Sequence, residues 1–312
     1  MTTLDRPVIA SPSQLDVLTR INIQDFQSSF GLGSSYFGKA ALDALCWVPA
    51  RRFARQMIAY DQQVAEEGLG QPSLRILGNY AGRLEVQGAE NVPAAGPLLV
   101  LANHPGMADT LILFSSLPRT DLRILAGERP FLQALPNVSR QLIYVPDDPG
   151  QRIGLVRSAV SHLRREGTVL IFPSGQIEPD PASMPGALES LQGWSESVSV
   201  FARLVPEVSI VVAVISGVIW PASIHNPIVR IRKQQKDRER MGASLQVLAN
   251  VLLPFYRPVT TRITFSPAFR PADSSDGSGL MQTVLRQAGR LIEQVKEGKA
   301  PSASQLAVDL ST

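Results

Sequence analysis

The sequence predicts an α/β fold: a mixed, largely parallel sheet flanked by helices and preceded by an N-terminal helical segment. From about residue 83, short apolar runs of strand length alternate with longer segments whose apolar residues recur at helical spacing. Residues 1–80 show helical spacing only, interrupted at Gly68-Leu69-Gly70. Hydrophobic residues make up 44% of the 312 residues and charged residues 18%, which is enough apolar content for a sizeable core.

We expect the chain to be divided into an N-terminal helical segment at residues 1–80, an α/β domain at 81–298 and a C-terminal tail at 299–312, with at most a short helix. The N-terminal pattern predicts helices near residues 15–23, 40–47 and 53–60, with a break at Pro49. Aromatic side chains in this segment lie close in sequence to Arg51, Arg52 and Arg55. They are Tyr36, Phe37, Trp47, Phe53 and Tyr60. Such a segment suits either a helix at a membrane surface or helices packed on the α/β domain with solvated Arg side chains.

The α/β domain is predicted from alternating strands and helices between residues 83 and 298. The strands are expected at residues 83–87, 97–101, 122–125, 141–145, 168–172, 209–215, 228–231 and 261–265. The helices are expected from about 109, at 152–165, near 196–204 and near 278–297. Alternation of this kind is typical of a sheet whose strands are joined by helical crossovers.

Composition excludes several classes of protein. A net charge of +3 is too small to indicate a nucleic-acid partner. The single cysteine, Cys46, lies in an apolar run, and the three histidines share no metal-ligand spacing, so we expect neither a disulfide nor a bound metal. The amino terminus lacks the order of a signal peptide, and the most apolar run, 208–218, is shorter than the ~20 residues of a membrane-spanning helix. We therefore expect a cytoplasmic location.

The sequence motif with the most chemical content is Asn103-His104-Pro105-Gly106-Met107-Ala108-Asp109. On one helix, a His and an Asp five positions apart would point about 140° away from each other. Pro105 and Gly106 force a turn after the His, and a helix can restart near Asp109. The Asp can then bond one ring nitrogen and raise the basicity of the other, which makes an oriented general base. Alternatively, Asp109 is only the N-cap of the following helix and His104 only a loop residue.

Two further loops follow predicted strands and carry polar or turn-forming residues. Pro173-Ser174-Gly175-Gln176 follows the strand that ends at Phe172, and Ser216-Gly217 follows the strand that ends at residue 215. Ligands of open α/β sheets bind at the carboxyl ends of strands. We expect these loops to meet the His104 loop there, with backbone N–H groups near Gly175, or in the turn after His104, open toward an anion or a developing oxyanion.

The order of these segments resembles the glycerolipid acyltransferases, the superfamily that includes the lysophosphatidic acid acyltransferases. Residues 103–109 match their Asn-His-x4-Asp motif, and Phe172-Pro173-Ser174-Gly175 is similar to their later Phe-Pro-Glu-Gly motif. The apolar run that ends at Gly217 and the Glu90-Asn91-Val92-Pro93 segment are also typical of them. The resemblance covers roughly residues 83–220 and is closest to the hemolysin-like, or ornithine-lipid acyltransferase-like, branch.

This resemblance implies roles for individual residues. His104 and Asp109 would be catalytic. The substrate-binding residues would be Asn103, Gly106, Arg129, Pro173, Ser174, Gly175, Gln176 and Gly217. Asn103 is expected to brace the turn rather than to react. Ser174 stands where the family has Glu, and Ile177 stands where many members have Arg. The block at residues 127–147 also lacks the family's usual Arg after its strand; Arg129 is a candidate to replace that Arg, with Arg123, Arg140 and Arg152 as alternatives.

The implied reaction moves a fatty acyl group from a thioester to a hydroxyl of a lysolipid or glycerolipid-type acceptor in phospholipid biosynthesis. The donor would be acyl-CoA or acyl-carrier protein, with no bound cofactor. His104 would be the general base, and the protein would be peripheral at the inner face of the cell membrane. A catalytically inactive lipid- or acyl-CoA-binding protein with the same fold is the alternative, because of Ser174 and Ile177. A hydrolase is less well supported, because the chain has no Gly-x-Ser-x-Gly nucleophile motif.

Overall fold

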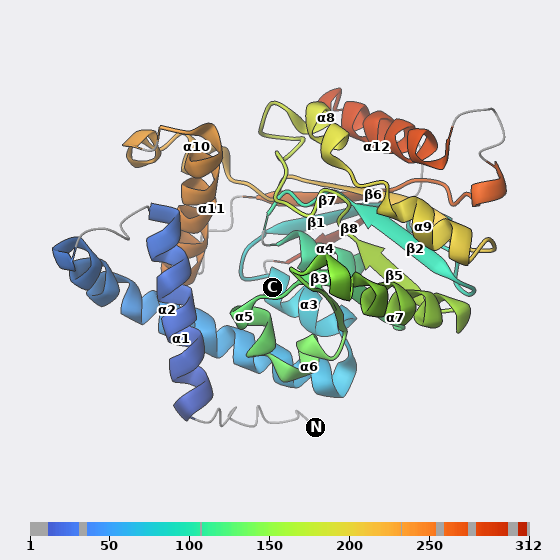
Figure 1. Ribbon diagram of the computed structural model, residues 1–312. Coiled ribbons are helices and arrows are strands. Elements are labelled where there is room, and N and C mark those ends of the chain that lie inside the picture. The colour runs from blue at the N-terminus through green and yellow to red at the C-terminus, as the bar shows by residue number, and fades with distance from the viewer. Residues whose placement is uncertain are drawn as a thin grey trace, which may run out of the picture. The chain divides into compact units, whose positions relative to one another are not determined.

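A computed structural model describes residues 12–30, 36–106, 108–231, 233–253, 259–273, 279–298 and 305–310 (Figure 1). The chain forms two compact units. Unit 1 comprises Met1–Gly68, Arg129–Arg140 and Ser223–Tyr256. Unit 2 comprises Leu69–Glu128, Gln141–Ala222 and Arg257–Thr312. The units thus interleave along the chain, whereas the sequence suggests consecutive segments; the functional division at residues 80 and 298 stays a prediction.

Unit 2 is built on a mixed, mostly parallel sheet of eight strands, which confirms the predicted fold class. The strands are β1 (Arg83–Gln87), β2 (Leu98–Ala102), β3 (Leu122–Gly127), β4 (Leu142–Val145), β5 (Thr168–Ile171), β6 (Ser209–Ser216), β7 (Thr260–Phe265) and β8 (Gln305–Asp309). Their order across the sheet is β4-β3-β5-β2-β6-β7-β1-β8. Among the strand pairs of the described residues, β6–β7 and β1–β8 are antiparallel and the others are parallel.

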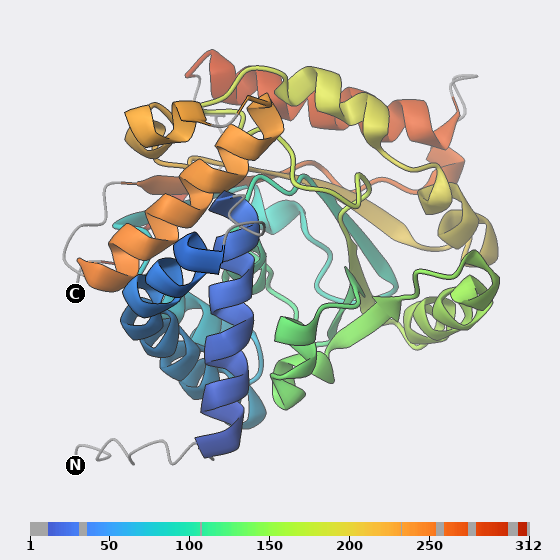
Figure 2. The same cartoon turned by 60° about the vertical axis from the view of Figure 1, so that its left-hand side comes forward.

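Helices and buried side chains enclose the central strands. On one face, the core includes residues of α7 (Arg152–Arg164), α9 (Ser197–Leu204) and α12 (Leu280–Lys296). Within β2, Leu99 and Leu101 belong to this core, while Leu98 and Val100 alternate with them and are also fully buried. Burial on both sides explains why β2 reads as a continuous apolar run. Helices α8 (Ala187–Ser190) and α12 lie on the same side of the sheet in both views (Figures 1 and 2).

Further helices of unit 2 pack against each other and against the sheet. Helix α3 (Gly70–Leu77) packs on α4 (Asp109–Ser116), and α4 also contacts β7. Short 3-10 turns complete the unit: η1 (Ala89–Asn91), η2 (Pro149–Gln151), η3 (Leu191–Gly193) and η5 (Pro271–Asp273). Helix α4 begins where the sequence predicts, and α7, α9 and α12 lie within two residues of their predicted ends.

The sheet topology brings three loops to one edge. Strand β2 lies between β5 and β6 and is parallel to both, with Leu101 opposite Ile171 and Ala102 opposite Ala213. The carboxyl ends of the three strands therefore meet at the same edge. The loops that follow them carry His104, Ser174 and Gly217, as the sequence analysis expects.

The carboxyl-terminal residues differ from the predicted tail. Residues 305–309 form β8, which pairs antiparallel with β1 from Gln305 opposite Gln87 to Asp309 opposite Arg83. The N–H of Leu310 also donates to the carbonyl oxygen of Gly82 at 3.0 Å. Without β8, β1 would be an edge strand with unpaired backbone groups. It therefore offers hydrogen-bond partners to residues 305–309, and local sequence patterns do not reveal such distant partners.

Unit 1 is helical throughout its described residues. It contains α1 (Pro12–Phe30), α2 (Tyr36–Glu67), α5 (Pro130–Gln133), α6 (Pro136–Ser139) and α11 (Gln235–Leu252). The short helix α10 (Pro221–Ile224), which straddles the boundary between the units, leads to the 3-10 turn η4 (Pro227–Ile231). Buried Asp61 of α2 accepts the N–H groups of Asn137 and Val138 at 2.9 and 2.8 Å, which satisfies the first turn of α6.

Two predictions for unit 1 are wrong. The predicted break at Pro49 does not occur, because α2 is one continuous helix with Pro49 inside it. Proline disfavours the interior of a helix. The residues that follow it on α2, Phe53, Ala54 and Ile58, are buried, and their packing offsets this cost. The predicted strand at 228–231 is instead the turn η4, in which the Asn226 side chain accepts the N–H of Ile228 at 3.0 Å.

Candidate active site

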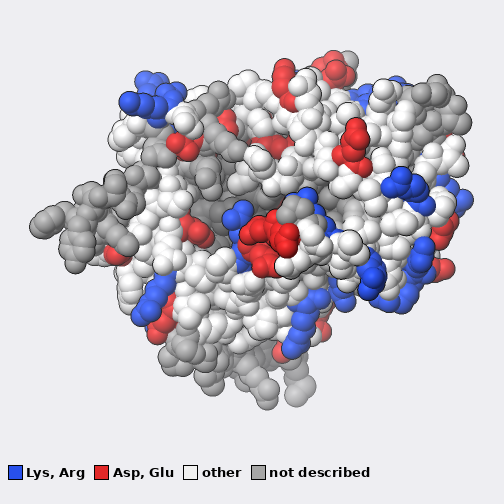
Figure 3. Space-filling model, in the orientation of Figure 1, with Lys and Arg blue, Asp and Glu red and all other residues white. Residues whose placement is uncertain are grey.

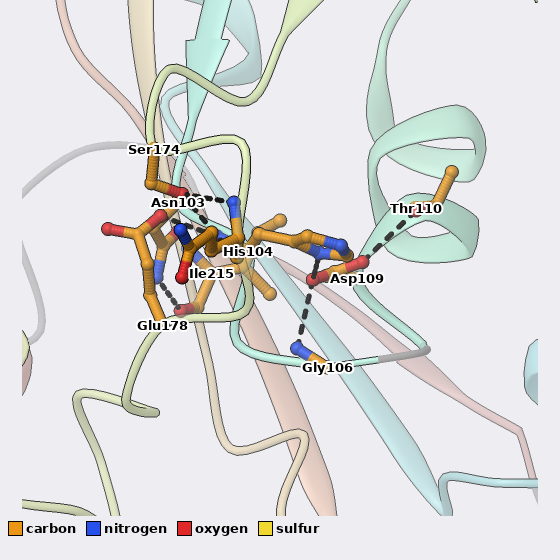
Figure 4. A network of polar contacts seen from close by, with 9 residues as sticks. Asn103, His104, Gly106, Asp109, Thr110, Ser174, Glu178 and Ile215 are labelled. Atoms are coloured by element: carbon orange, nitrogen blue, oxygen red, sulfur yellow. Dashed lines mark hydrogen bonds and ion pairs between the residues drawn. The ribbon is translucent and has the colours of Figure 1, made fainter. Parts of the chain in front are cut away.

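His104 and Asp109 are in direct contact. His104 Nδ1 lies 2.6 Å from Asp109 Oδ2, and Figure 4 shows the imidazole directed toward this carboxylate. With Nδ1 donating to Asp109, Nε2 is the ring nitrogen that can accept a proton. The Asp109 side chain is fully buried, whereas the His104 side chain keeps 28% of its surface exposed. The arrangement is that of a carboxylate-oriented imidazole with access to solvent.

Asp109 is not the N-cap that the alternative interpretation requires. It is the first residue of α4, and the N-cap position is occupied by Ala108. Asp109 instead bonds backward, because Oδ2 also accepts the N–H of Gly106 at 3.0 Å, while Oδ1 accepts the hydroxyl of Thr110 at 3.1 Å. These donors and the helix N-terminus stabilise a buried carboxylate.

The environment of the His104 ring favours its protonated form. Burial alone would lower its pKa, but the charge and hydrogen bond of Asp109, together with the Glu178 carboxylate, outweigh burial and raise the pKa of His104 above its ordinary value. The opposite side of the site is aromatic, since the ring stacks on Phe172 with centroids 4.6 Å apart. This contact limits rotation of the imidazole away from Asp109.

Asn103 connects the His104 loop to the neighbouring strand. Its side-chain amide donates to the carbonyl oxygen of Ile215 at 2.9 Å and accepts the N–H of Ile215 at 2.7 Å. Asn103 is 2% exposed. Both ends of the amide are therefore bonded to β6, which supports the expected bracing role and leaves the side chain little access to a substrate.

The loop after β5 begins with the predicted residues Pro173, Ser174, Gly175 and Gln176. Pro173 is buried, and its carbonyl oxygen accepts the N–H of Ser195 at 3.0 Å. The Gly175 N–H donates to the carbonyl oxygen of Phe172 at 3.0 Å, and the Gln176 N–H donates to Ser174 Oγ at 3.2 Å. These amides, like that of Gly106, are bonded internally, contrary to the expectation that they are open to an oxyanion. Residues 175–177 are nevertheless exposed, so a substrate can reach this loop.

Glu178, which sequence reasoning missed, is central to the site. It is 5% exposed, and its Oε2 accepts the N–H of His104 at 3.0 Å, while Oε1 accepts the indole N–H of Trp194 at 2.8 Å. Burial raises the pKa of Glu178 although these bonds, and one from Ser174, act in the opposite direction. One signal in the sequence could have identified Glu178. It is a carboxylate a few residues after β5, whose carboxyl end lies beside that of β2, the strand that precedes His104.

Asp180, also missed, holds the third loop. Its fully buried side chain accepts the N–H groups of Gly217, Val218 and Ile219 at 2.8–2.9 Å, and that of Ala182 at 2.9 Å. Gly217 adopts φ +71°, and a Cβ there would lie 2.3 Å from the carbonyl oxygen of Thr260, so glycine is required. Burial raises the pKa of Asp180 in spite of its four backbone donors. The predicted residue Gly217 therefore belongs to the site's scaffold through Asp180.

One predicted site residue belongs to a different unit from the others. Arg129 begins the middle segment of unit 1, whereas the other predicted residues belong to unit 2. Its role in substrate binding stays a prediction. Figure 3 shows Lys and Arg side chains dispersed among Asp, Glu and uncharged residues on the face drawn. No three His, Cys, Asp or Glu side chains of the described residues are grouped as metal ligands would be, and the absence of a metal likewise stays a prediction.

Comparisons with known proteins identify the class of this domain. Residues 83–216 match the family model described as Acyltransferase. This match confirms the resemblance to acyltransferases expected from the His104 motif. The matched stretch contains β1 to β6, the His104–Asp109 pair and the loop with Glu178 and Asp180.

Among solved structures, the chain is similar to the 1-acyl-sn-glycerophosphate (LPA) acyltransferase PlsC from Thermotoga maritima. The two share 16% sequence identity with a TM-score of 0.45, over 89% of this chain and 97% of that chain. No curated protein matches this sequence. The resemblance to the family rests on the sequence match of residues 83–216.

We predict that Asp180→Ala strongly destabilises unit 2. The substitution leaves four buried or partly buried N–H groups without their acceptor, so the free energy of unfolding should fall by about 3–5 kcal/mol. Urea unfolding measures this change. The matched control is Asp148→Ala, because exposed Asp148 also accepts a backbone N–H, that of Gly150, at 2.9 Å. The control should lose less than about 1 kcal/mol, and equal losses in the two variants would contradict the role of Asp180.

Proposed function

We propose that the protein transfers a fatty acyl group from an acyl thioester, acyl-CoA or acyl-carrier protein, to a hydroxyl of a lysolipid or glycerolipid-type acceptor. The observation that carries the proposal is the His104 Nδ1–Asp109 contact of 2.6 Å inside the stretch that matches the acyltransferase family model. The pair provides a base, and the thioester supplies an activated acyl group. No covalent enzyme intermediate is needed.

The proposed step follows from the orientation of the ring. Nε2 of His104 takes the proton from the acceptor hydroxyl while the oxygen attacks the thioester carbonyl carbon. The tetrahedral adduct collapses with cleavage of the C–S bond, and the imidazolium returns the proton to the leaving thiolate. Asp109 holds the tautomer with hydrogen on Nδ1 and stabilises the imidazolium.

Loop exposure supports an acceptor contact at residues 175–177. Gly175, Gln176 and Ile177 are exposed, and Ile177 keeps 52% of its surface accessible. We propose that the acceptor lies against this loop next to His104. The apolar Ile177 suits a lipid chain or an uncharged part of the acceptor better than a phosphate group.

The alternative, a catalytically inactive binding protein, is less well supported because the residues of the base are intact. Ser174, which suggested that alternative, makes hydrogen bonds within its own loop and to Glu178. Binding of acyl-CoA without thiol release by any tested acceptor would favour the alternative.

Membrane association is the second part of the proposal. No described helix has the length and apolar character to cross a bilayer. On α2, however, Leu45, Trp47 and Val48 are exposed by 72%, 49% and 61%, and the Arg51 guanidinium lies 5.2 Å from the Trp47 ring centroid. Phe53 and Tyr60, in contrast, are buried within unit 1. We propose that the exposed group inserts at the surface of a membrane with anionic lipids.

We predict that His104→Ala lowers the rate of acyl transfer about 10²–10⁴-fold, because the step loses its general base. Thiol release from acyl-CoA and from acyl-carrier protein, with mass spectrometry of the acylated product, measures the rate over a panel of lysolipid acceptors. His225→Ala is the control, since His225 is an exposed residue of unit 1, and it should keep wild-type activity. Unchanged turnover in folded His104→Ala protein would contradict the mechanism.

We predict that kcat/KM rises with pH through a midpoint above the ordinary imidazole value of about 6.5. The base acts only when neutral, and the raised pKa of His104 keeps it protonated to a higher pH. Asp109→Asn removes the charge that raises this pKa, so the midpoint should move to lower pH while the maximal rate falls. A wild-type midpoint below 6.5 would disprove the assignment of His104 as the base in this environment.

We predict that replacing Leu45, Trp47 and Val48 together with Ser reduces flotation of the protein with vesicles that contain anionic lipid. The change removes the exposed apolar surface that would enter the bilayer. The control replaces the exposed residues Ile153 and Leu204 of unit 2 with Ser and should float like the wild type. Equal flotation of all three proteins would exclude this group as the membrane contact.

A further inference from the structure

We propose that Glu178 is a positioning residue that holds the main chain of His104 at two points and places a second carboxylate beside the base. The inference rests on the function proposed above and adds a residue to its mechanism. Glu178 lies in the loop after β5, on a different strand end from His104. It would therefore couple two of the three loops that form the site.

Two hydrogen bonds join Glu178 to the backbone of His104. The main-chain N–H of Glu178 donates to the carbonyl oxygen of His104 at 2.8 Å, and the N–H of His104 donates to Glu178 Oε2 at 3.0 Å. Both backbone polar groups of the base are thus bonded by one residue. Figure 4 shows Glu178 at the main chain of His104, on the side away from Asp109. Asp109 fixes the ring, and Glu178 fixes the peptide from which the ring extends.

Hydrogen-bond donors surround both oxygens of the Glu178 carboxylate. Oε2 accepts from His104, and Oε1 accepts from Trp194 and lies 3.1 Å from the Ser190 hydroxyl. Both oxygens therefore face N–H donors, which an ionised carboxylate satisfies and a glutamine cannot, because its NH2 would oppose one of them. Within the described parts of the chain, the donors to Glu178 are neutral N–H and hydroxyl groups, so they stabilise the buried charge without a contact from Lys or Arg. A charge held in this way is placed to interact with the imidazolium that forms in the reaction.

Acyl transfer requires the base to be held in a precise position relative to the acceptor hydroxyl. Displacement of a catalytic group by about 1 Å can reduce a rate about 10²-fold. Asn103 bonds this loop to β6, and Asp109 accepts the N–H of Gly106, but neither contact bonds the N–H or carbonyl group of His104 itself, whose peptide therefore needs a direct restraint. The two bonds from Glu178 supply this restraint, and Trp194, itself 5% exposed, holds the carboxylate in place.

The decisive experiment is Glu178→Gln, compared with wild type by NMR titration of isotopically labelled histidine. The chain has three histidines, so loss of one signal in His104→Ala identifies the resonance. The Gln variant should titrate His104 at lower pH, and the acid limb of its kcat/KM profile should shift the same way. Its kcat should fall about 10- to 100-fold, with a smaller change in KM. An unchanged titration midpoint and an unchanged acid limb would overturn the proposal.

Glu178→Asp separates position from charge and serves if the Gln variant does not fold. It keeps the negative charge, but its shorter side chain cannot contact both His104 and Trp194. The His104 midpoint should then stay above the ordinary imidazole value while kcat falls at every pH. Wild-type kcat in the Asp variant would overturn the positioning role. Lower thermal stability without any change in kcat or in the titration would reduce Glu178 to a structural residue.

Ser190→Ala is the matched control for disturbance around the carboxylate. It removes one hydroxyl near Oε1 but keeps the charge and the bonds to His104 and Trp194, so the His104 midpoint should equal that of wild type. A shift as large as that of the Gln variant would show that the charge of Glu178 is not the cause. The titration needs no substrate. Suppose that the titration shows coupling of Glu178 to His104 but the wild-type protein transfers no acyl group. This result would refute the proposed function, while the proposal for Glu178 as a contact of His104 would stand.

Discussion

The bond between His104 and Asp109 depends on where the fold places a buried charge. Asp109 is fully buried, and an isolated carboxylate there would be costly. Its position at the first residue of α4, the Gly106 N–H and the Thr110 hydroxyl offset that cost. These groups come together only because β2 ends at the sheet edge and the chain reverses before α4. The contact between His104 and Asp109 is therefore a consequence of the strand, the turn and the helix that follow one another in this segment.

Local patterns predicted the parts of the fold that local physics determines. Seven of the strands, the start of α4 and the His104–Asp109 contact follow from apolar periodicity and from the turn at Pro105-Gly106. The continuous α2 and the pairing of β8 with β1 depend on partners distant in sequence, which periodicity does not reveal. Residues 228–231 have strand-like composition, but their backbone bonds locally in η4.

The same limit applies to the site. The three loops could be assigned to one sheet edge because parallel strands point their carboxyl ends the same way. Glu178 and Asp180 were missed because their role is to bond backbone groups of other loops, those of His104 and of Gly217 to Ile219. A sequence shows which residues carry charge, but the acceptors of particular N–H groups become known only when the loops are folded together. Arg129, chosen by analogy, belongs to unit 1.

Internal carboxylates also determine which part of the site is free to vary. The backbone of His104 is bonded to Glu178, that of Gly217 to Asp180, and that of Ile215 to the Asn103 side chain. Substitutions there disturb several contacts at once. Residues 175–177 are exposed, and a Cβ at Gly175 would have no heavy atom within 4 Å, although its φ of +61° favours glycine. Divergence among relatives that accept different substrates should therefore concentrate at exposed positions of this loop such as Ile177, which can change while the contact between His104 and Asp109 is kept.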